Sequence, residues 1–318
     1  MQFKSAIIGC GKIAGGYDIK VPDKWSFTHA GAYHLCKETR LTAIADISEK
    51  ALNEFSQKWE VGNCYTDYKE LLEKESIDVL SICLPTEKHY EVFKYACKKG
   101  IKAIFCEKPL SYDLGEARDM VGMSNGRVVV VNYFRRWNPA LVQLREELCG
   151  GKFGKVLNAT IHYTKGLFVN GSHLVDLMRW FFGEPKDVRL IRTNWQDARD
   201  SGVDFFMTFS NNITSYFLNV QGANYVFINI DILTEKGRIV IGQRGQKIEK
   251  YEEVAEPHFQ RFDILKRVET KETGWRDCLT IAVQEMVDCL ENGGRTSCTP
   301  EDGLRALEIC CDIVSQRE

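Results

Sequence analysis

A glycine-rich segment directly after a short apolar stretch constrains the fold of this chain most. Residues 3–8 (FKSAII) have the composition of a buried strand, and GCGKIA follows at residues 9–14. This is the G-x-G-x-x-A form of the dinucleotide-binding pattern, in the place after a strand where that pattern occurs. The segment therefore predicts a strand, a tight turn and a helix that together bind the phosphates of a dinucleotide.

Each position of this segment has a physical role in that prediction. Gly9 permits the tight turn, Gly11 lets the backbone approach a pyrophosphate, and the small Ala14 permits close packing of the following helix. The N–H groups at the start of that helix, around Lys12 and Ile13, are expected to face the phosphates. We therefore expect Gly9, Gly11, Lys12 and Ile13 to bind the cofactor.

An aspartate stands at the end of the second expected strand. Residues 41–45 (LTAIA) form this strand, and Asp46 follows it, where an acid accepts hydrogen bonds from the adenosine ribose hydroxyls. An acid there favours NAD and repels the 2′-phosphate of NADP. The alternative is an ordinary helix cap before Ser48. Because the glycines and Asp46 are further apart than the usual ~20 residues, we expect an inserted loop at residues 15–27.

Strands and helices continue to alternate along the first part of the chain, which indicates a parallel sheet. The expected strands are residues 77–84, 101–106 and 128–131, and the expected helices are residues 87–99, 114–123 and 138–148. The carboxyl edge of such a sheet binds ligands. The expected cofactor-binding residues at this edge therefore also include Leu84, Pro85, Thr86 and His89.

A charged pair and a proline, Glu107, Lys108 and Pro109, follow the strand at residues 101–106. Pro109 keeps Lys108 out of the helical region, so that the amine is held in one direction. A lysine partly desolvated at the mouth of a cleft has a lowered pKa and exchanges protons near neutral pH. The alternative is a solvated pair at a surface turn. The position at the ligand-binding edge favours Lys108 as a catalytic residue and, with Glu107, as a cofactor-binding residue.

The character of the chain changes after Gly150 and Gly151. Several β-rich stretches follow between residues 155 and 251, with one helix at residues 172–182, and helices near residues 277–291 and 301–316 end the chain. This pattern predicts an α+β domain built on a largely antiparallel open sheet. We expect a Rossmann-type α/β dinucleotide-binding domain at residues 1–125 (completed or linked by residues 128–131 and 138–148), a substrate and oligomerisation domain at residues 151–290, and a C-terminal helix at residues 291–318.

Composition limits the partners of the chain. It has 42 basic and 44 acidic side chains and a net charge of −2, so neither a nucleic-acid surface nor a membrane-binding basic patch is expected. No apolar run approaches the ~20 residues that span a bilayer, and a strand pattern stands where a signal peptide would be, which predicts a cytoplasmic protein. The 12 cysteines are scattered without a C-x-x-C pair, so no metal site is expected.

Together these motifs resemble the Gfo/Idh/MocA family, named for glucose-fructose oxidoreductase, inositol dehydrogenase and a rhizopine-catabolism protein. The similarity covers nearly the whole chain and includes residues 9–14, Asp46, residues 84–86 with His89, residues 107–109, GSHLVD at residues 171–176 and TPEDG at residues 299–303. It implies a nicotinamide cofactor on the first domain and a sugar, cyclitol or nucleotide sugar on the second. It also implies that Lys108 reaches both, often from a cis peptide before Pro109, that His173 lies at the reacting carbon, and that a homodimer or homotetramer forms through the open sheet face.

One departure from the family pattern concerns proton transfer. Many members carry an aspartate four residues before the histidine, where this chain has Val169. Oxidation of an alcohol requires that the hydroxyl proton be removed as the carbonyl forms. We therefore expect Lys108 and His173 to act as the acid/base and polarising groups, with Tyr163 and Lys165 in reserve. The alternative for His173 is a helix-start histidine bound to backbone.

Substrate contacts are expected from two places. Arg135, Arg136 and Trp137 follow the strand at residues 128–131, and arginines there could clamp a phosphate or carboxylate. Ordinary interdomain ion pairs are the equal alternative. The second expected substrate contact is Asn170, which is close to His173 in the sequence.

Two functions remain open at this point. The first is an NAD-dependent oxidoreductase that transfers a hydride between nicotinamide and a hydroxyl or keto carbon of a small sugar or nucleotide sugar. The second is a cofactor-binding sensor or regulatory protein of the same fold with little or no turnover, which the loss of the acid at Val169 encourages. The presence of both Lys108 and His173 favours the enzyme.

Overall fold

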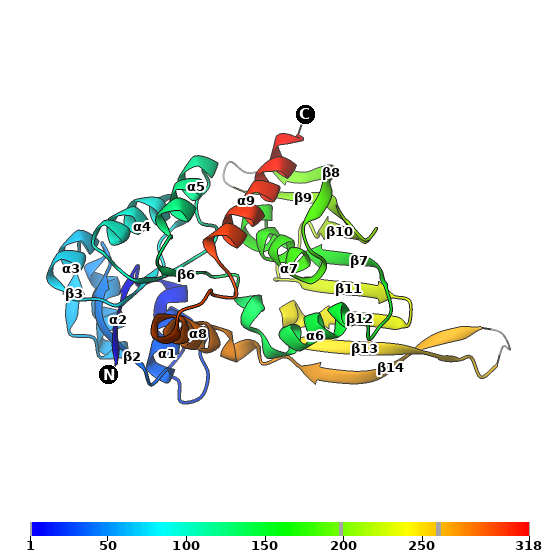
Figure 1. Cartoon of the computed structure of the whole chain (residues 1–318), viewed down its shortest axis with the longest axis horizontal. Coiled ribbons are helices and arrows are strands. Elements are labelled where there is room, and N and C mark those ends of the chain that lie inside the picture. Colours follow the sequence, from blue (N-terminus) through cyan, green and yellow to red (C-terminus); the bar gives the residue numbers. More distant parts are fainter. Residues whose placement is uncertain (1, 197–199, 259–261, 318) are drawn as a thin grey trace. The chain divides into compact units, whose positions relative to one another are not determined.

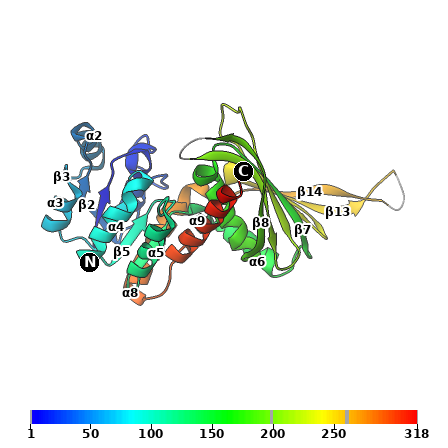
Figure 2. The same ribbon diagram turned by 90° about the horizontal axis from the view of Figure 1, so that it is seen from above.

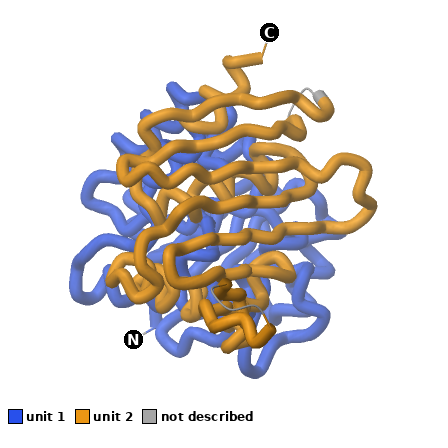
Figure 3. The backbone as a smooth tube through the Cα atoms, turned by 90° about the vertical axis from the view of Figure 1, so that its right-hand side faces the viewer, with its two compact units in different colours: residues 1–137, 276–307 blue, residues 138–275, 308–318 orange. Residues whose placement is uncertain are grey.

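The computed structural model describes residues 2–196, 200–258 and 262–317. Contacts divide the chain into two compact units, coloured separately in Figure 3: a first unit of residues 1–137 and 276–307, and a second unit of residues 138–275 and 308–318. Helix α8 (Cys278–Asn292) groups with the first unit because it packs against α1 (His29–Leu35) and β6 (Val128–Val131). The division therefore differs from the continuous segments expected from the sequence.

The first unit contains a six-stranded parallel sheet; the parallel sheet is the one predicted from the sequence, but β3 was not among the expected strands. The strands are β1 (Phe3–Ile8), β2 (Thr39–Ala45), β3 (Asn63–Tyr65), β4 (Val79–Ile82), β5 (Ala103–Cys106) and β6. Their order is β3-β2-β1-β4-β5-β6, and every neighbouring pair is parallel. In this order β1 and β4 lie side by side where the winding of the chain reverses, which is the ligand-binding position of such sheets.

Helices connect these strands, as Figure 1 shows. They are α1, α2 (Glu49–Trp59), α3 (Tyr68–Lys74), α4 (His89–Lys98) and α5 (Leu114–Met123). Helix α5 has the bounds predicted from the sequence, because Asp113 accepts a hydrogen bond from the N–H of Glu116 and so marks the first turn (2.8 Å). Ser48 caps α2 in the same way through the N–H of Ala51 (3.3 Å).

The second unit is built on an eight-stranded sheet with the order β14-β13-β12-β11-β7-β10-β9-β8. Its strands are β7 (Val156–Tyr163), β8 (Pro185–Gln196), β9 (Ser201–Phe209), β10 (Thr214–Asn219), β11 (Ile228–Thr234), β12 (Gly237–Gly242), β13 (Lys247–Ala255) and β14 (Asp263–Glu272). Among the described strands of this second sheet, only β7 and β10 pair in parallel. This confirms the largely antiparallel sheet.

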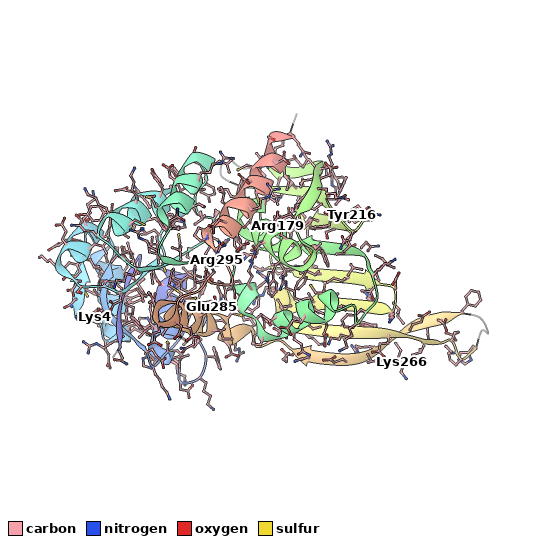
Figure 4. All side chains as sticks on the ribbon, viewed as in Figure 1. Lys4, Arg179, Tyr216, Lys266, Glu285 and Arg295 are labelled. Atoms are coloured by element: carbon pink, nitrogen blue, oxygen red, sulfur yellow. The ribbon has the colours of Figure 1, made fainter. Side chains whose placement is uncertain are left out.

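Helices of the second unit pack on one side of its sheet. They are α6 (Pro139–Cys149), α7 (Ser172–Phe182) and residues 308–315 of α9 (Pro300–Ser315). Figure 2 shows α6 beside the sheet, and Figure 3 shows the strands side by side on the opposite face. Between the layers, the rings of Phe205 and Phe217 stack at a centroid distance of 4.2 Å, and Leu174 and Met178 of α7 are fully buried. Figure 4 marks Arg179 on α7 and Tyr216 on β10.

The pair β13–β14 was not fully predicted. Expected β structure ended near residue 251, whereas β13 continues to Ala255 and pairs along its length with β14. Nearly all residues of β14 are exposed, so its sequence has no alternation of buried and exposed positions to reveal a strand. In Figures 1 and 4 this pair projects from the sheet, and Figure 4 marks Lys266 on β14.

In residues 2–196, 200–258 and 262–317, no helix is both long and apolar enough to cross a bilayer. The same residues bring together no group of three or more His, Cys, Asp and Glu side chains that could hold a metal ion. The 12 cysteines are free thiols.

Candidate functional site

The carboxyl ends of four neighbouring strands bring the predicted cofactor-binding residues of the first unit to one edge. Gly9 follows β1, Asp46 follows β2, residues 84–86 follow β4, and residues 107–109 follow β5. The strand order places β1 between β2 and β4. The tertiary structure therefore gathers side chains that the sequence separates by up to a hundred positions.

The two glycines of the fingerprint have different surroundings. Gly9 has a φ of +94°, and a Cβ there would lie 2.6 Å from the carbonyl oxygen of Cys83, so both its conformation and its packing require glycine. Its N–H donates to the carbonyl of Ala45 (2.8 Å). A Cβ on Gly11 would meet no described atom within 4 Å. The backbone at Gly11 is thus open, as close approach of a pyrophosphate requires.

The segment after the glycines corrects one prediction. Instead of entering a long helix, residues Lys12–Gly16 form a single π-helical turn, in which the N–H groups of Gly15 and Gly16 both donate to the carbonyl of Gly11 (3.3 Å). Close packing of this segment was expected to depend on Ala14, and it depends on Gly15 as well. A Cβ on Gly15 would lie 2.5 Å from Cε2 of Phe55. The regular helix α1 begins only at His29.

The expected insertion forms a loop held by Asp18. Its carboxylate accepts hydrogen bonds from the Ser26 hydroxyl (2.8 Å), the Phe27 N–H (3.0 Å) and the Thr28 hydroxyl (2.5 Å). The amine of Lys58 donates to the carbonyls of Gly15 (2.8 Å) and Asp18. Helix α2 therefore fixes both the π-helical turn and the start of the loop.

Asp46 ties the end of β2 to the fingerprint. Its Oδ2 accepts the N–H of Cys10 (2.7 Å), and its Oδ1 accepts the N–H of Ser48 (2.9 Å). Ser48, rather than Asp46, provides the side-chain cap of α2. Because each carboxylate oxygen can accept more than one hydrogen bond, these contacts leave acceptor capacity for ribose hydroxyls.

His89 lies behind this edge rather than on it. It is 1% exposed, and its ring nitrogens contact two carbonyl oxygens, Nδ1 that of Pro109 and Nε2 that of Leu84, each at 2.9 Å. Burial lowers the pKa of His89, and the contacts with the two carbonyls oppose this shift without reversing it. His89 thus connects the turn after β4 with the turn after β5.

The turn after β5 combines a largely buried acid, whose side chain is 13% exposed, with a half-buried lysine. The peptide between Lys108 and Pro109 is cis, as the family resemblance implied. Glu107 accepts hydrogen bonds at Oε1 from His29 Nε2 (2.9 Å) and from Asn132 Nδ2 (2.6 Å). Burial raises the pKa of Glu107, but the contacts with His29, Asn132 and the positive Lys108 together bring it below its ordinary value. The carboxylate beside Lys108 is therefore ionised at neutral pH.

The expected substrate residues after β6 make contacts inside the first unit. The residues Phe134–Trp137 form a short 3-10 turn, in which Arg135, Arg136 and Trp137 are buried. The Arg136 guanidinium donates to the carbonyl of Ser297 (2.9 Å) and to Asp302 (3.1 Å). Trp137 Nε1 donates to a carboxylate oxygen of Glu285 (2.8 Å). Arg136 and Trp137 thus have structural partners in their own unit, and neither the expected clamp nor an interdomain pair is needed to explain them.

His173 is the second residue of α7 in the second unit. A π-helical turn, Leu167–Gly171, precedes it and contains both Val169 and Asn170. The Asn170 side-chain amide donates to the carbonyl of Thr164 (2.8 Å), and the backbone of Lys165 has a φ of +61°. The Asn170 amide therefore holds the turn that leads to His173.

Tyr163 is not available as a reserve catalytic group. Its ring is fully buried, and its hydroxyl donates to the carbonyl of Val203 (2.6 Å). Burial raises the pKa of this phenol well above its ordinary value. Tyr163 is therefore a core residue of the second unit.

Asp200 places a carboxylate against the turn that lacks an acid in the sequence. Its oxygens accept the N–H groups of Phe168 (2.8 Å) and Val169 (3.2 Å). A Cβ on Gly166 would collide with this carboxylate, so the glycine makes room for it. Asp200 follows β8 and is 31 residues from Val169 in the sequence. No local sequence pattern therefore indicated that Asp200 contacts this turn.

His29 and Asn132 were also not predicted as site residues. They contact Glu107 from sequence distances of 78 and 25 residues. His29 is the first residue of α1, and Asn132 directly follows β6. The position of Asn132 after a strand of the same sheet was the one available signal.

Comparison with known proteins agrees with this arrangement. Residues 3–133 match a family model described as "Oxidoreductase family, NAD-binding Rossmann fold", and residues 145–316 match one described as "Oxidoreductase family, C-terminal alpha/beta domain". The two models together extend over most of the chain. The glycine turn, Asp46 and the Glu107–Lys108 pair thus lie within a recognised NAD-binding domain.

Individual relatives are more distant. Myo-inositol 2-dehydrogenase of Thermotoga maritima is 31% identical over 49% of this chain, and the match spans about half of that relative (51%). The uncharacterized oxidoreductase YrbE of Bacillus subtilis is 24% identical over 97% of this chain and 92% of its own length. The structure of levoglucosan dehydrogenase with NADH and levoglucosan superimposes with a TM-score of 0.84 at 18% identity, covering 99% of this chain and 97% of that one, which shows a shared fold.

Proposed function

The chain belongs to the Gfo/Idh/MocA oxidoreductase family, and on this premise we propose that it is an NAD-dependent dehydrogenase acting on a CH–OH carbon of a small sugar-type substrate. One observation carries the proposal: the open glycine turn, Asp46 and the Glu107–Lys108 pair share one edge of the parallel sheet. A bound nicotinamide would exchange a hydride with the substrate carbon. The protein must then hold both molecules and move one proton.

The roles of the residues follow from their surroundings. Gly11 leaves space for the phosphates, and Asp46 accepts hydrogen bonds from ribose hydroxyls. Lys108 exchanges the hydroxyl proton of the substrate as the carbonyl forms or is reduced. His173 is the second candidate for this proton exchange. In the alternative assignment, its imidazole polarises the substrate oxygen by donating a hydrogen bond to it. Asn170 is the proposed substrate contact nearest to His173 in the chain, and Lys165 is the reserve group for proton transfer.

The proposed substrates are sugars and cyclitols, with nucleotide sugars as larger candidates. This choice rests on the relatives named for myo-inositol and levoglucosan, which are polyhydroxylated rings. The decisive experiment follows absorbance of the reduced cofactor while such compounds are added one at a time. We expect turnover with NAD for at least one compound.

The same assay tests the role of Lys108. The variant Lys108→Met should lower kcat by about 100-fold or more, as expected for loss of an acid/base group, while NADH binding is retained. The matched control is Lys102→Met, since Lys102 is an exposed lysine just before β5. Equal activity of Lys108→Met and Lys102→Met would refute the catalytic role.

The second candidate function is a cofactor-binding sensor. The lack of an acidic side chain at Val169 is the observation that favours it. Tight NADH binding without turnover across the whole panel would support the sensor and refute the enzyme. The retained Lys108 and His173 are the reason that we place the enzyme first.

We also propose a homodimer or homotetramer that forms through the open sheet face of the second unit. The register places Phe206, Tyr216, Thr160 and Asp231 in one row across β9, β10, β7 and β11. On β10, Ser215 and Phe217 are buried while Tyr216 between them is 42% exposed. The variant Tyr216→Glu should therefore reduce the mass measured by light scattering, whereas Tyr112→Glu, on the first unit, should not.

A further inference from the structure

A chain of buried hydrogen bonds connects α1 with the turn that carries Lys108. The Tyr33 hydroxyl lies 2.7 Å from the Ser81 hydroxyl, and Ser81 Oγ lies 2.8 Å from His29 Nδ1. His29 Nε2 lies 2.9 Å from Glu107 Oε1. The side chain of His29 is fully buried, and that of Glu107 is 13% exposed. The chain of contacts therefore ends on an acid next to the proposed catalytic lysine.

The directions of these hydrogen bonds follow from their donors and acceptors. An ionised Glu107 only accepts, so Nε2 of His29 carries a hydrogen and donates to it. In the neutral imidazole, Nδ1 then accepts from the Ser81 hydroxyl, and Ser81 accepts from the Tyr33 hydroxyl. With these directions each hydrogen of the chain has an acceptor, and Glu107 accepts as a negative carboxylate.

The other groups that act on Glu107 leave its charge in place. Burial raises the pKa of the Cys83 and Cys106 thiols, so both stay neutral. Burial lowers the pKa of His89, which interacts with Glu107 from α4. His29 and Lys108 both favour the negative charge on Glu107, and Lys108 is the lysine among the groups that act on this carboxylate.

We propose that His29 is a positioning residue for Lys108: by donating to Glu107, it holds an ionised carboxylate in a fixed place beside the lysine, where it acts as the counter-charge of the amine. The inference rests on the proposed role of Lys108 in proton transfer. A buried charge is costly unless it is hydrogen-bonded, so the carboxylate needs both His29 and Asn132 to remain ionised. A histidine that merely packed α1 on the sheet would not need an acidic partner at the site.

Two substitutions of His29 separate these roles. In His29→Gln the amide nitrogen takes the place of Nε2 and still donates to Glu107. In His29→Asn the shorter amide takes the place of Nδ1, reaches Ser81 and leaves Glu107 without this donor. Tyr33→Phe is the control, because it removes a hydrogen bond from the far end of the same buried chain without touching Glu107.

The first measurement is independent of turnover. Carbon-13 NMR of labelled glutamate carboxyl groups gives the titration midpoint of Glu107, assigned by its loss in Glu107→Gln. We expect His29→Asn to raise this midpoint by about one pH unit, and His29→Gln and Tyr33→Phe to leave it near the wild-type value. An unchanged midpoint in His29→Asn, or an equal rise in Tyr33→Phe, overturns the proposal.

The second measurement concerns the lysine itself. The pH dependence of acylation of Lys108, followed by mass spectrometry, should shift down by about one pH unit in Glu107→Gln, because the amine loses its counter-charge. An unchanged acylation curve overturns the counter-charge role. Both measurements can be made on the protein even if no substrate of the panel is turned over, so failure of the proposed function is distinguished from failure of this inference.

The third measurement uses the active enzyme. The acid limb of the pH profile of kcat/KM should move to higher pH in His29→Asn, together with the Glu107 midpoint, and should return to the wild-type position in His29→Gln. A purely structural role would lower activity at all pH values without moving this limb. A shifted midpoint with an unmoved limb would overturn the positioning role.

Discussion

The carboxylate of Asp200 occupies the position that a Cβ of residue 166 would take, so that a side chain on Gly166 would have to displace it. The two residues are brought together at the π-helical turn Leu167–Gly171, whose N–H groups at Phe168 and Val169 donate to Asp200. Asp200 thus caps the turn from a distant part of the chain. It restores a negative group near the position where the family aspartate is missing, while its oxygens are engaged with backbone.

This contact predicts that substitutions of Asp200 and Gly166 lower the stability of the second unit. Asp200→Asn should lower the free energy of unfolding by about 1–2 kcal/mol, because an amide cannot accept both N–H groups as a carboxylate does. Gly166→Ala should cost about 1–3 kcal/mol through overpacking against Asp200. Urea denaturation measures both. The control Gly122→Ala, in α5 with open space around a Cβ, should be neutral or slightly stabilising, and an equal loss there would contradict the explanation.

Substitutions of the two fingerprint glycines should affect folding and cofactor binding differently. Gly11→Ala meets no described protein atom, so thermal stability should be unchanged while NADH affinity falls at least about tenfold, because the methyl group occupies the phosphate approach. Gly9→Ala should lower both, since its positive φ and the carbonyl of Cys83 oppose a Cβ. Thermal unfolding and NADH fluorescence titration are the measurements. Normal NADH binding by Gly11→Ala would place the pyrophosphate elsewhere.

Asp46 should determine the preference for NADH over NADPH. Asp46→Ala removes a charge-assisted acceptor, so NADH affinity should fall by about tenfold or more. The affinity for NADPH should fall less or rise, because repulsion of the 2′-phosphate is also removed. Parallel titrations with the two cofactors measure the ratio. Since Asp46 also accepts the N–H groups of Cys10 and Ser48, thermal unfolding of the variant serves as a check on folding, and an unchanged ratio would refute the assignment.

His89 should make stability depend on pH in the acid range. Its native pKa is lowered by burial, whereas the unfolded chain takes up a proton below about pH 6.5. The unfolded state therefore binds more protons as the pH falls, and the native state loses stability. In His89→Gln this loss is absent, so the deficit of the variant relative to the wild type should shrink between about pH 7.5 and about pH 5.

Urea denaturation at several pH values measures this difference. His34→Gln is the matched control, because His34 is an exposed histidine in the same unit. A deficit of His89→Gln that grows toward acid pH would show that the buried ring is protonated in the native state, opposite to the prediction.

Much of the fold followed from local sequence signals. The strand β6 and the helices α5 and α7 have the bounds expected from periodicity and end signals. The π-helical turn after Gly11 did not follow, because the pattern of glycines is the same whether a long helix or a single turn comes next. Nor did β14, whose exposed residues carry no alternation. Local patterns reveal elements that bury one face, and they fail where burial is absent or the chain departs from regular geometry.

The residues of the candidate site also fall into two groups, those that local sequence patterns predicted and those that only the tertiary structure identified. The sequence by itself determined the dinucleotide fingerprint, the acid after β2 and the Glu107–Lys108–Pro109 turn, because each depends on residues that are adjacent in the chain. Only the tertiary structure decided that His29 holds Glu107, that His89 joins two turns, that Tyr163 is a core residue and that Asp200 reaches the turn at Val169. These contacts form between strands and helices far apart in the chain, and hydrogen bonding between such groups depends on the packing that brings them together, which no local pattern records.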